Sequence, residues 1–530
     1  MLPFLQRFGG FYIHLRSKWK HWVLFLLILC LGIFARTWEF NRLPPGLNAD
    51  EASIGVDAFN LYHYGIDRNG ISFPIQFISW GSGQNALYGY LLIPFIAIFG
   101  LSPVIVRTPM LISGILTLPL VFLVGRKTIN TQFGFLSMFF LAISPWHIVL
   151  SRWGLESNLF PFIFLIGFSC LLYLEKDRKW FIPACLFFAL SLYAYSTAFA
   201  MVPIFMVCTT IILPLTRIAR IRELIPGYLT FIIIAIPMGI FVLINAFGLN
   251  SIKLGPITLP RLPVSARFIT QAVIFNGNPL PGLLGNLWTT LRLLLLQSDG
   301  LISNTVEPFG YFYKITFPLA LIGIILLVQF DKTTLPAKKM FLLSWFGASF
   351  LIGVIQEPNV NRLNIIFIPI ILSIAYCLFW LNNFFKFVLP TSICLLLVGF
   401  ILFTISYHGE PYRQQINYKF NAGLFSALEL TKQFENNPIC MTDKINMPYI
   451  FALFSEKSDP LNYLDTVKYV DPQAPLRQVA SFGRYTFGWK NCIGSKSFVY
   501  LLRSDEIPPP LGERYKFEFF ENFVVYYPKT

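Results

Sequence analysis

Long apolar segments separated by short polar segments recur along the first 407 residues of the chain. Each segment is long enough to cross the hydrocarbon core of a bilayer, about 30 Å thick, when tilt and short ends are allowed. We predict eleven membrane-spanning helices: His21–Trp38, Val104–Val124, Phe133–Leu150, Leu159–Leu174, Trp180–Tyr195, Ala198–Leu215, Leu224–Ala246, Ile315–Phe330, Met340–Ile355, Leu363–Leu381 and Phe387–Tyr407. The pattern therefore predicts an α-helical polytopic membrane protein.

The apolar run Ala86–Gly100 is only marginally long enough to cross, and charge decides where it lies. If the run lies in the interface, 16 Lys and Arg but 4 Asp and Glu fall on the side of the N-terminus, against 11 and 9 in the opposite loops before Tyr407. The positive-inside rule makes the richer side cytoplasmic. Counting the run as a span would turn every later basic cluster outward. We therefore predict an interfacial helix, with loop 39–103 and residues 408–530 on the outer face.

The outer loop 39–103 begins with residues that end one helix and start another. The Pro-Pro-Gly sequence at 44–46 cannot continue a helix, whereas Asn48 followed by Glu51 is a capping-box arrangement. We predict an amphipathic helix Asp50–Tyr64 and a second, interfacial helix Ala86–Phe99. Two acids in a first turn are favoured by the helix dipole alone. At the rim of a bilayer, however, Ser or Thr would cap the helix as well, and removing their hydroxyl groups from water would cost less than removing a carboxylate. We therefore interpret Asp50 and Glu51 as candidate catalytic residues.

Composition supports the membrane assignment and separates off the C-terminal part. Hydrophobic residues make up 55% of the chain and charged residues 13%, against about 25% charged in soluble domains. The net charge of +15 belongs to the membrane part, which carries 27 basic and 13 acidic residues before Tyr407, against 14 and 13 from Tyr407 onward. This distribution favours membrane lipids over nucleic acid as the partner of the basic residues.

Residues 1–407 are thus predicted to form the membrane domain, and residues 408–530 a small extracytoplasmic α/β domain. In the latter we expect a helix at Asn421–Asn436, strands at Pro438–Thr442 and Ser497–Arg503, and a closing hairpin at Tyr515–Tyr527. Cys440 and Cys492 are able to pair there if the compartment is oxidising and the geometry permits. The cysteines show no metal-ligand spacing, and no metal site is assigned.

Four sequence features occur in an informative order: Asp50-Glu51-Ala52 after the first span, Phe-Gly-Leu-Ser-x-x-x-x-Arg at 99–107, Ser-Pro-Trp-His at 144–147, and Glu156 within Ser151–Asn158. With them, the chain resembles polytopic glycosyltransferases of the GT-C type, which include the protein O-mannosyltransferases, the aminoarabinose transferase of lipid A and the bacterial family 39 transferases. The resemblance implies a hexosyl or pentosyl transferase in a bacterial cytoplasmic membrane. It would move a sugar from a polyprenyl-phosphate donor, by inversion at the outer face, to a hydroxyl of a lipid, glycan or protein.

The resemblance and the acidic loop suggest roles for individual residues. Asp50 is the predicted base, with Glu51 and Glu156 supporting it by binding sugar hydroxyls or, as the weaker alternative, a divalent ion. Arg362 and Arg152 are the predicted phosphate ligands, because Arg binds phosphate in a bidentate manner. The basic residue that the family often carries before the second interfacial helix is replaced here by Gly81-Ser-Gly-Gln-Asn85. Further predicted substrate-binding residues are Gln84, Asn85, Asn361, His63 and Tyr64.

Two other classes of protein fit parts of the pattern. A lipid-linked sugar transporter or flippase would require ionisable residues in the middle of the membrane and interrupted helices at matching positions of two halves. In this chain the charges lie at the ends of the apolar segments and no internal repeat is seen. A membrane anchor that only presents the C-terminal domain does not account for acidic residues gathered on one face.

Overall fold

A computed structural model describes residues 2–80, 82–264, 270–275, 277–328, 336–472, 474, 477–492 and 497–529, with side chains from Trp19 onward and without that of Pro336. Several predictions fall on residues outside this part of the chain: Gly81, the end of the span Ile315–Phe330, Lys332, and the side chains of Arg7, Arg16 and Lys18.

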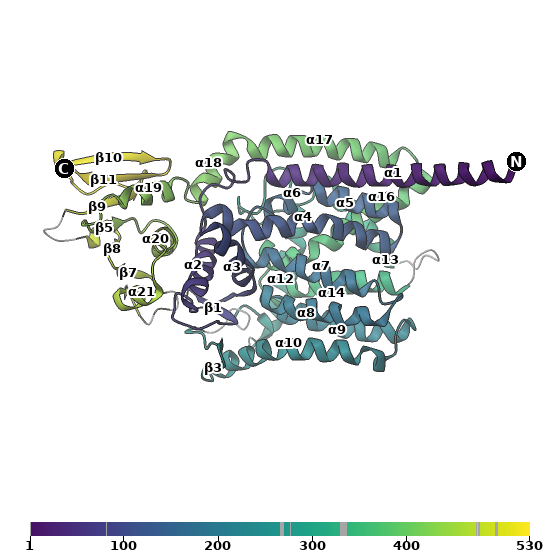
Figure 1. Ribbon diagram of the computed structural model, residues 1–530, viewed down its shortest axis with the longest axis horizontal. Helices are drawn as coiled ribbons and strands as arrows, with labels where there is room; N and C mark the ends of the chain where they lie inside the picture. The colour runs from purple at the N-terminus through teal and green to yellow at the C-terminus, as the bar shows by residue number, and fades with distance from the viewer. Residues whose placement is uncertain are drawn as a thin grey trace.

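The membrane part is a bundle of helices that run side by side (Figure 1). Among the described residues, seven segments are long and apolar enough to cross a membrane: Trp19–Thr37 of α1 (Leu2–Thr37), α4 (Pro103–Thr128), α9 (Ala198–Leu215), α10 (Ile221–Phe247), Ala337–Ile355 of α14 (Pro336–Ile355), Val360–Phe384, which holds α15 (Val360–Leu363) and α16 (Phe367–Phe384), and α17 (Val388–His408). Shorter helices complete the bundle: α5 (Thr131–Ile143), α6 (Pro145–Leu150), α7 (Glu156–Leu171), α8 (Phe181–Ala194) and α13 (Phe317–Val328). The predicted polytopic helical fold is confirmed, while the number of eleven crossings stays a prediction.

One predicted span, Phe133–Leu150, consists of two helices. Helix α5 ends at Ile143 and α6 begins at Pro145, because a residue before proline is driven out of the helical conformation and Ser144 is extended. A distant loop holds this break: the Ser144 hydroxyl and the Trp146 N–H both donate to the carbonyl of Tyr311, at 3.0 and 2.9 Å.

The start of the apolar segment Trp19–Thr37 of α1 lies beside the end of α4. Phe25 packs edge-on against Phe122 at 5.2 Å between ring centroids, and His21 stacks on Phe135 at the start of α5 at 5.8 Å. Helices α1 and α4 are therefore antiparallel, as expected if the intervening apolar run 86–100 does not change sides. Basic residues meet at this same end of the bundle, in the contacts Lys127 with Tyr173, Lys338 with Glu175, and Arg178 with Glu223.

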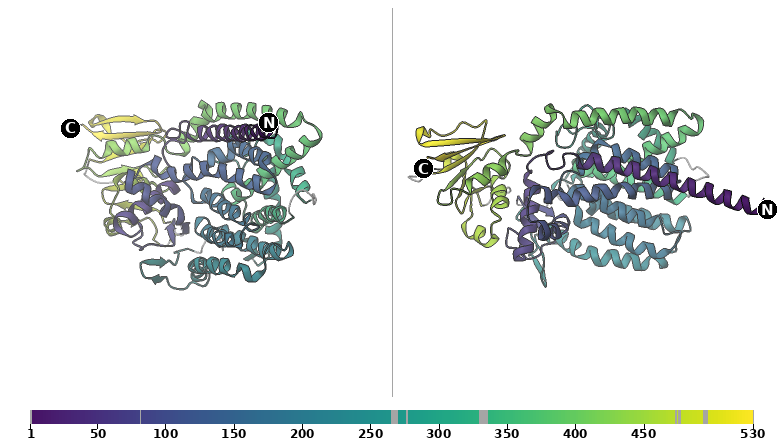
Figure 2. Two further views of the ribbon diagram at one scale, coloured as in Figure 1. Left: turned by 45° about the vertical axis from the view of Figure 1, so that its right-hand side comes forward. Right: turned by 45° about the horizontal axis from the view of Figure 1, so that its top comes forward.

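Loop 39–103 lies between the bundle and the C-terminal domain in all three views (Figures 1 and 2). It contains α2 (Ala49–Tyr64), an antiparallel hairpin of β1 (Gln76–Ser79) and β2 (Ser82–Asn85), and α3 (Leu87–Phe99). The predicted capping box is confirmed, since the Glu51 N–H donates to the Asn48 side chain at 2.8 Å and the Asn48 N–H donates to the Glu51 carboxylate at 3.2 Å. The segment between α10 and α13 adds β3 (Ile252–Leu254), β4 (Ile257–Leu259) and α12 (Pro279–Leu296).

The C-terminal part is built on a seven-stranded sheet of order β10-β11-β9-β5-β8-β7-β6, in which β5 is parallel to both of its neighbours. Its elements are α18 (Glu410–Lys419), α19 (Leu424–Thr431), β5 (Ile439–Met441), α20 (Pro448–Glu456), α21 (Pro460–Thr466), β6 (Lys468–Tyr469), β7 (Val479–Phe482), β8 (Tyr485–Phe487), β9 (Val499–Arg503), β10 (Tyr515–Phe520) and β11 (Phe523–Pro528). The predicted strands and closing hairpin are confirmed. The predicted helix Asn421–Asn436 is shorter, because Gly423 has a left-handed conformation (φ 85°) before α19.

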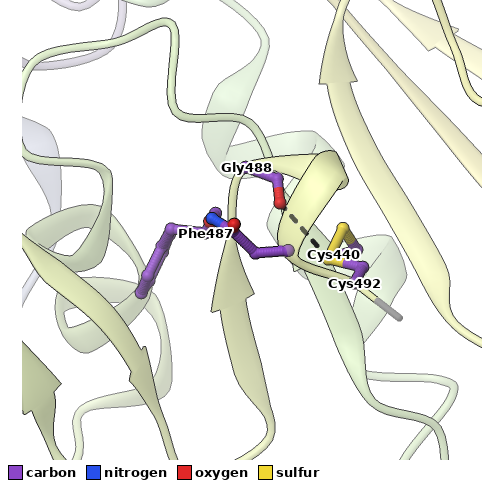
Figure 3. The surroundings of a disulfide bond; sticks show 5 residues. Cys440, Phe487, Gly488 and Cys492 are labelled. Atoms are coloured by element: carbon purple, nitrogen blue, oxygen red, sulfur yellow. Dashed lines mark hydrogen bonds between the residues drawn. A yellow bond between two sulfur atoms is a disulfide. The ribbon is translucent and has the colours of Figure 1, made fainter. Parts of the chain in front are cut away.

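A disulfide joins Cys440 of β5 to Cys492, with 6.1 Å between the Cα atoms (Figure 3). It bridges 52 residues and ties the turn after β8 to the central strand of the sheet. This is the pairing that the sequence left open.

The C-terminal domain packs directly on α2 through α20. A Cβ added to Gly55 of α2 would lie 2.7 Å from the ring of Phe454 and 2.9 Å from Val106, so glycine permits this close approach. Nearby, the side chain of Asn421 donates to the carbonyl of Leu47 at 3.2 Å. The first turn of α2 is therefore held between the bundle and the C-terminal domain.

Candidate functional site

A polar pocket with a cavity of about 180 Å³ opens where α2, the β1–β2 hairpin and the start of α7 meet the segment 356–362. Its lining residues are Asp50, Gln76, Gly83, Asn85, Leu155, Glu156, Ser157, Tyr195, Ser196, Phe241, Leu262, Gln271, Gln356, Asn359, Asn361 and Arg362. Five residues that the sequence singles out thus line one pocket: Asp50, Glu156, Asn85, Asn361 and Arg362.

Asp50 is the second residue of α2, and its orientation is set by an indole. The Trp80 Nε1–H donates to Asp50 Oδ1 at 2.9 Å, and Trp80 lies in the turn of the hairpin with a positive φ of 56°. No hydrogen bond to Asp50 Oδ2 is found in the described part of the chain. One carboxylate oxygen is therefore anchored while the group as a whole faces the pocket.

Glu156 is the first residue of α7, where the helix dipole favours a carboxylate. The side-chain amide of Gln84 donates to Glu156 Oε2 at 3.3 Å, and the Ser53 hydroxyl donates to Gln84 Oε1 at 3.1 Å. Gln84 is buried and contacts the predicted acidic residue directly. It acts on the site through Glu156 without itself lining the pocket.

Glu51 turns away from the pocket and is fully buried. The guanidinium of Arg107, near the start of α4, donates to Oε1 at 2.7 Å and to Oε2 at 2.9 Å, and the Gly154 N–H donates to Oε1 at 2.9 Å. Arg107 also donates to the carbonyls of Pro44 and Gly46 at 2.6 and 2.7 Å. The geometry gives Glu51 a positioning role, because its oxygens bind the protein and not the pocket.

Arg152 is also fully buried and does not line the pocket. Its guanidinium donates to the carbonyl of Leu43 at 3.0 and 2.8 Å and to that of Trp38 at 2.6 Å, which joins the end of α1 to the segment before α2. His63 and Tyr64 lie at the far end of α2, where His63 packs against Phe59 at 4.3 Å. The structure does not bring these three predicted substrate ligands to the pocket.

Arg362 reaches the pocket from α15. Its backbone N–H donates to the N-capping side chain of Asn359 at 3.0 Å. Its guanidinium donates to the backbone carbonyl of Glu357 and lies 3.5 Å from the carboxylate of the same residue. Glu357 is 77% exposed, so this ion pair is weak and exchangeable for another anion. Asn85, opposite, is held by donation to the carbonyl of Leu192 at 3.3 Å.

An apolar groove of about 490 Å³ runs beside the pocket. Residues close together in the chain line the two cavities. Asn85 lines the pocket and Ala86 the groove, while Tyr193 of α8 lines the groove and Tyr195, just after α8, lines the pocket. The groove is lined by Phe73, Ile75, Ala86, Leu87, Tyr90, Leu190, Tyr193, Ile234, Pro256 and Ile257. A polar and an apolar compartment thus lie next to each other at the outer-loop end of the bundle.

Sequence reasoning missed Arg107, Trp80 and Arg68 as parts of the site. An arginine just inside a membrane span needs a buried partner, which was the available signal for Arg107. Arg68 forms a buried ion pair with Asp57 at 3.3 Å, and neither residue lies in a recognisable motif. Within the described residues, no group of three or more His, Cys, Asp or Glu is placed to hold a metal ion.

Comparisons with known proteins bear on the fold that carries this pocket. Residues 85–241 match a family model described as dolichyl-phosphate-mannose-protein mannosyltransferase. In structure the chain is similar to ArnT from Cupriavidus metallidurans, solved bound to undecaprenyl phosphate, with 11% identity, a TM-score of 0.56, and 96% of this chain and 97% of that chain covered. It is also similar to an oligosaccharyltransferase from Archaeoglobus fulgidus in the apo form, with 14% identity, a TM-score of 0.50 and 83% of this chain covered. The match spans 64% of that archaeal chain.

No curated protein matches the sequence. The predicted resemblance is nevertheless confirmed by the family model and by the structures: the chain has the GT-C fold of membrane glycosyltransferases, with a sheet domain at its C-terminus.

Proposed function

We propose that this GT-C fold protein transfers a sugar from a polyprenyl-phosphate donor to an acceptor hydroxyl, by inversion, with Asp50 as the base. One observation carries the proposal: Asp50, Glu156 and Arg362, from three distant segments, line a single polar pocket beside an apolar groove. An amphiphilic donor requires such a pair of compartments, one for the sugar phosphate and one for the lipid.

The roles follow from the chemistry of the transfer. The acceptor hydroxyl must lose a proton as its oxygen attacks the anomeric carbon, and the lipid phosphate leaves with negative charge. Asp50 faces the pocket and is suited to accept the proton. Arg362 is suited to stabilise the phosphate once its ion pair with the exposed carboxylate of Glu357 has opened. Attack from the side opposite the leaving phosphate inverts the anomeric centre.

Glu156 and the amides of the pocket are suited to bind the sugar. Ionised carboxylates accept hydrogen bonds from hydroxyl groups, whereas side-chain amides both accept and donate them. Asn85, Gln76 and Asn361 line the same cavity. The apolar groove would take the first isoprene units, because burial of apolar surface contributes about 25 cal/mol per Å². Whether the sugar is a hexose or pentose is decided by how these groups fit its hydroxyls.

Two features support an outer-face site in a bacterial cytoplasmic membrane. Helix α4 runs away from the C-terminal domain, and its last turn carries Lys127 (Figure 1). The other basic contacts, of Lys338 and Arg178, gather near the same end of the bundle, and positive residues favour the cytoplasm. The disulfide Cys440–Cys492 in the C-terminal domain is typical of an oxidising compartment. The pocket lies on the same side as that domain.

The test compares the turnover of purified wild-type protein with that of Asp50→Asn on a panel of polyprenyl-phosphate sugars and acceptors. The panel is chosen by identifying the envelope glycans that disappear when the gene is deleted. We expect Asp50→Asn to lower turnover at least 100-fold with the donor still bound, because only the proton acceptor is lost. Asp465→Asn, at an exposed position of helix α21, is the matched control and should keep full turnover. Wild-type turnover retained in Asp50→Asn would remove Asp50 from the role of base.

A further inference from the structure

Arg68 is a buried cation that does not line the pocket and that the transfer chemistry does not require. It follows α2 by four residues, is 2% exposed, and forms an ion pair with Asp57 of α2 at 3.3 Å. Its Nη1 donates to the Ser53 hydroxyl at 2.5 Å, and its Nη2 donates to the Ser79 hydroxyl and to the carbonyl of Ile78, both at 3.2 Å. Arg68 therefore ties α2 to strand β1.

The hydrogen-bond directions in this cluster lead to Glu156. Arginine only donates, so Ser53 accepts from Arg68, and Ser79, which also accepts from Arg68, has its own proton available for Ser53 at 3.2 Å. With both lone pairs of the Ser53 oxygen engaged, its proton goes to Gln84 Oε1. Gln84 is then held with its NH₂ group towards Glu156.

A second path leads from the same guanidinium to Asp50. The guanidinium carbon of Arg68 lies 5.2 Å from the centroid of the Trp80 ring, within the range of a cation–π contact. Tyr449 of the C-terminal domain approaches the same indole edge-on at 6.1 Å. The ring is thereby held from two sides with its N–H donated to Asp50 at 2.9 Å.

We infer that Arg68 is a positioning residue that orients both pocket carboxylates, Glu156 through Ser53 and Gln84, and Asp50 through Trp80. The inference rests on the transferase proposed above for the meaning of the pocket, but its geometry does not depend on which sugar is moved. Without Arg68, the Ser53 hydroxyl is free to accept from the Gln84 amide. The amide then turns its oxygen towards Glu156, where an ionised carboxylate is repelled and a protonated one is favoured.

The charged surroundings define what the experiment must control. Burial raises the pKa of the Asp57 carboxyl to about 7, against the lowering effect of Arg68, and burial also raises the pKa of Asp67. Tyr449 and Tyr463 face Arg68 from the C-terminal domain. Around Glu156, the charged groups that share the pocket are Asp50 and Arg362.

The variant Asp57→Asn/Arg68→Met removes the guanidinium without leaving the carboxylate of Asp57 unpaired, so it is the variant best able to fold. We expect its kcat to fall at least 10-fold with donor KM changed less than 3-fold, and the acidic limb of its pH–rate profile to move up by about one pH unit. Arg68→Lys keeps the positive charge but not the forked contacts of the guanidinium, so its kcat should lie between those of the wild type and the double variant.

A second measurement is independent of turnover. Infrared difference spectra between acidic and neutral pH show the bands of carboxyl groups that become protonated. The band that is missing in Glu156→Gln belongs to Glu156. The apparent pKa of this band should rise by about one unit in Asp57→Asn/Arg68→Met. Adding Asp57→Asn/Arg68→Met to a Gln84→Ala protein should not raise this apparent pKa further, because both changes act through the amide of Gln84.

The outcomes separate the two proposals. A folded double variant with an unshifted infrared titration and an unshifted pH–rate profile overturns the positioning role of Arg68. A shifted infrared titration in a protein that transfers no sugar from any donor supports the positioning role and refutes the proposed transferase. A lowered melting temperature with unchanged titration and kcat shows that Arg68 only stabilises the fold, which also overturns the inference.

Discussion

The buried ion pair between Glu51 and Arg107 offers a sharp test of how the first turn of α2 is held. Both side chains are almost completely removed from solvent, at 0% and 3% exposed. We expect Arg107→Met to destabilise the protein, because it leaves the Glu51 carboxylate buried with only the N–H groups of Asn48 and Gly154 as partners. It also leaves the carbonyls of Pro44 and Gly46 without their guanidinium donor.

The magnitude follows from the burial of the pair. Removing one partner of a buried, hydrogen-bonded pair costs about 3–5 kcal/mol, since an uncompensated charge remains inside the protein. An exposed pair on the same chain gives the contrast: Lys432 and Glu429 of the C-terminal domain are 35% and 71% exposed, and such pairs contribute at most about 1 kcal/mol. Replacing both buried charges, in Glu51→Gln/Arg107→Met, should recover part of the loss.

The assay is equilibrium unfolding of detergent-solubilised protein titrated with dodecyl sulfate, for wild type, the two single variants and the double variant. The cycle should give a coupling free energy of at least about 2 kcal/mol, with Glu429→Gln unchanged as the control. If Arg107→Met unfolds like wild type, or if the two single effects simply add, the carboxylate of Glu51 is not held as an ion pair. Glu51 would then be available for the contact with the sugar that the sequence predicted.

Two further predictions concern pH and redox conditions. Burial raises the pKa of Asp57 to about 7 in the folded protein, so this group stabilises the fold most at low pH and loses that contribution as pH rises towards 7. Asp57→Asn should therefore gain stability relative to wild type between pH 5 and pH 7, by up to about 3 kcal/mol, and a constant or falling difference in unfolding midpoint would show that the attraction of Arg68 outweighs burial. Cys440→Ser/Cys492→Ser should lower stability by about 2–4 kcal/mol, because the bond closes a long loop. A reducing agent should lower the melting temperature of the wild type to that of Cys440→Ser/Cys492→Ser and leave the variant unaffected. Equal melting temperatures of the two proteins without a reducing agent would mean that the bond does not form.

Local features of the fold were predictable, and the directions of side chains were not. The helix after residues 44–46 and its capping box depend on residues within one turn, so Asn48 and Glu51 sufficed to predict them. The break at Pro145 was readable from the proline, but the apolar composition on both sides concealed it as one continuous span. The existence of the closing hairpin, but not its register, followed from alternation along Tyr515–Tyr527.

Arg152 and Glu156 show why the site was only partly predictable. Both belong to one short outer segment, and the sequence placed them together on that face. Between them the chain bends at Trp153, so Glu156 starts α7 and faces the pocket, whereas Arg152 points back to the carbonyls of Leu43 and Trp38. Which way a side chain points across a turn depends on tertiary contacts that spacing does not contain.

The hairpin β1–β2 is the element that joins the two halves of the pocket. Asp50 and Glu156 each lie in the first turn of a different helix, and each accepts a hydrogen bond from the hairpin, Asp50 from Trp80 and Glu156 from Gln84. The separation of the two carboxylates is therefore set by the register of the hairpin and by the guanidinium that braces it. The transfer proposed for this pocket would therefore depend on residues outside the spans, in the stretch between Arg68 and α3, as well as on the two carboxylates that this stretch contacts.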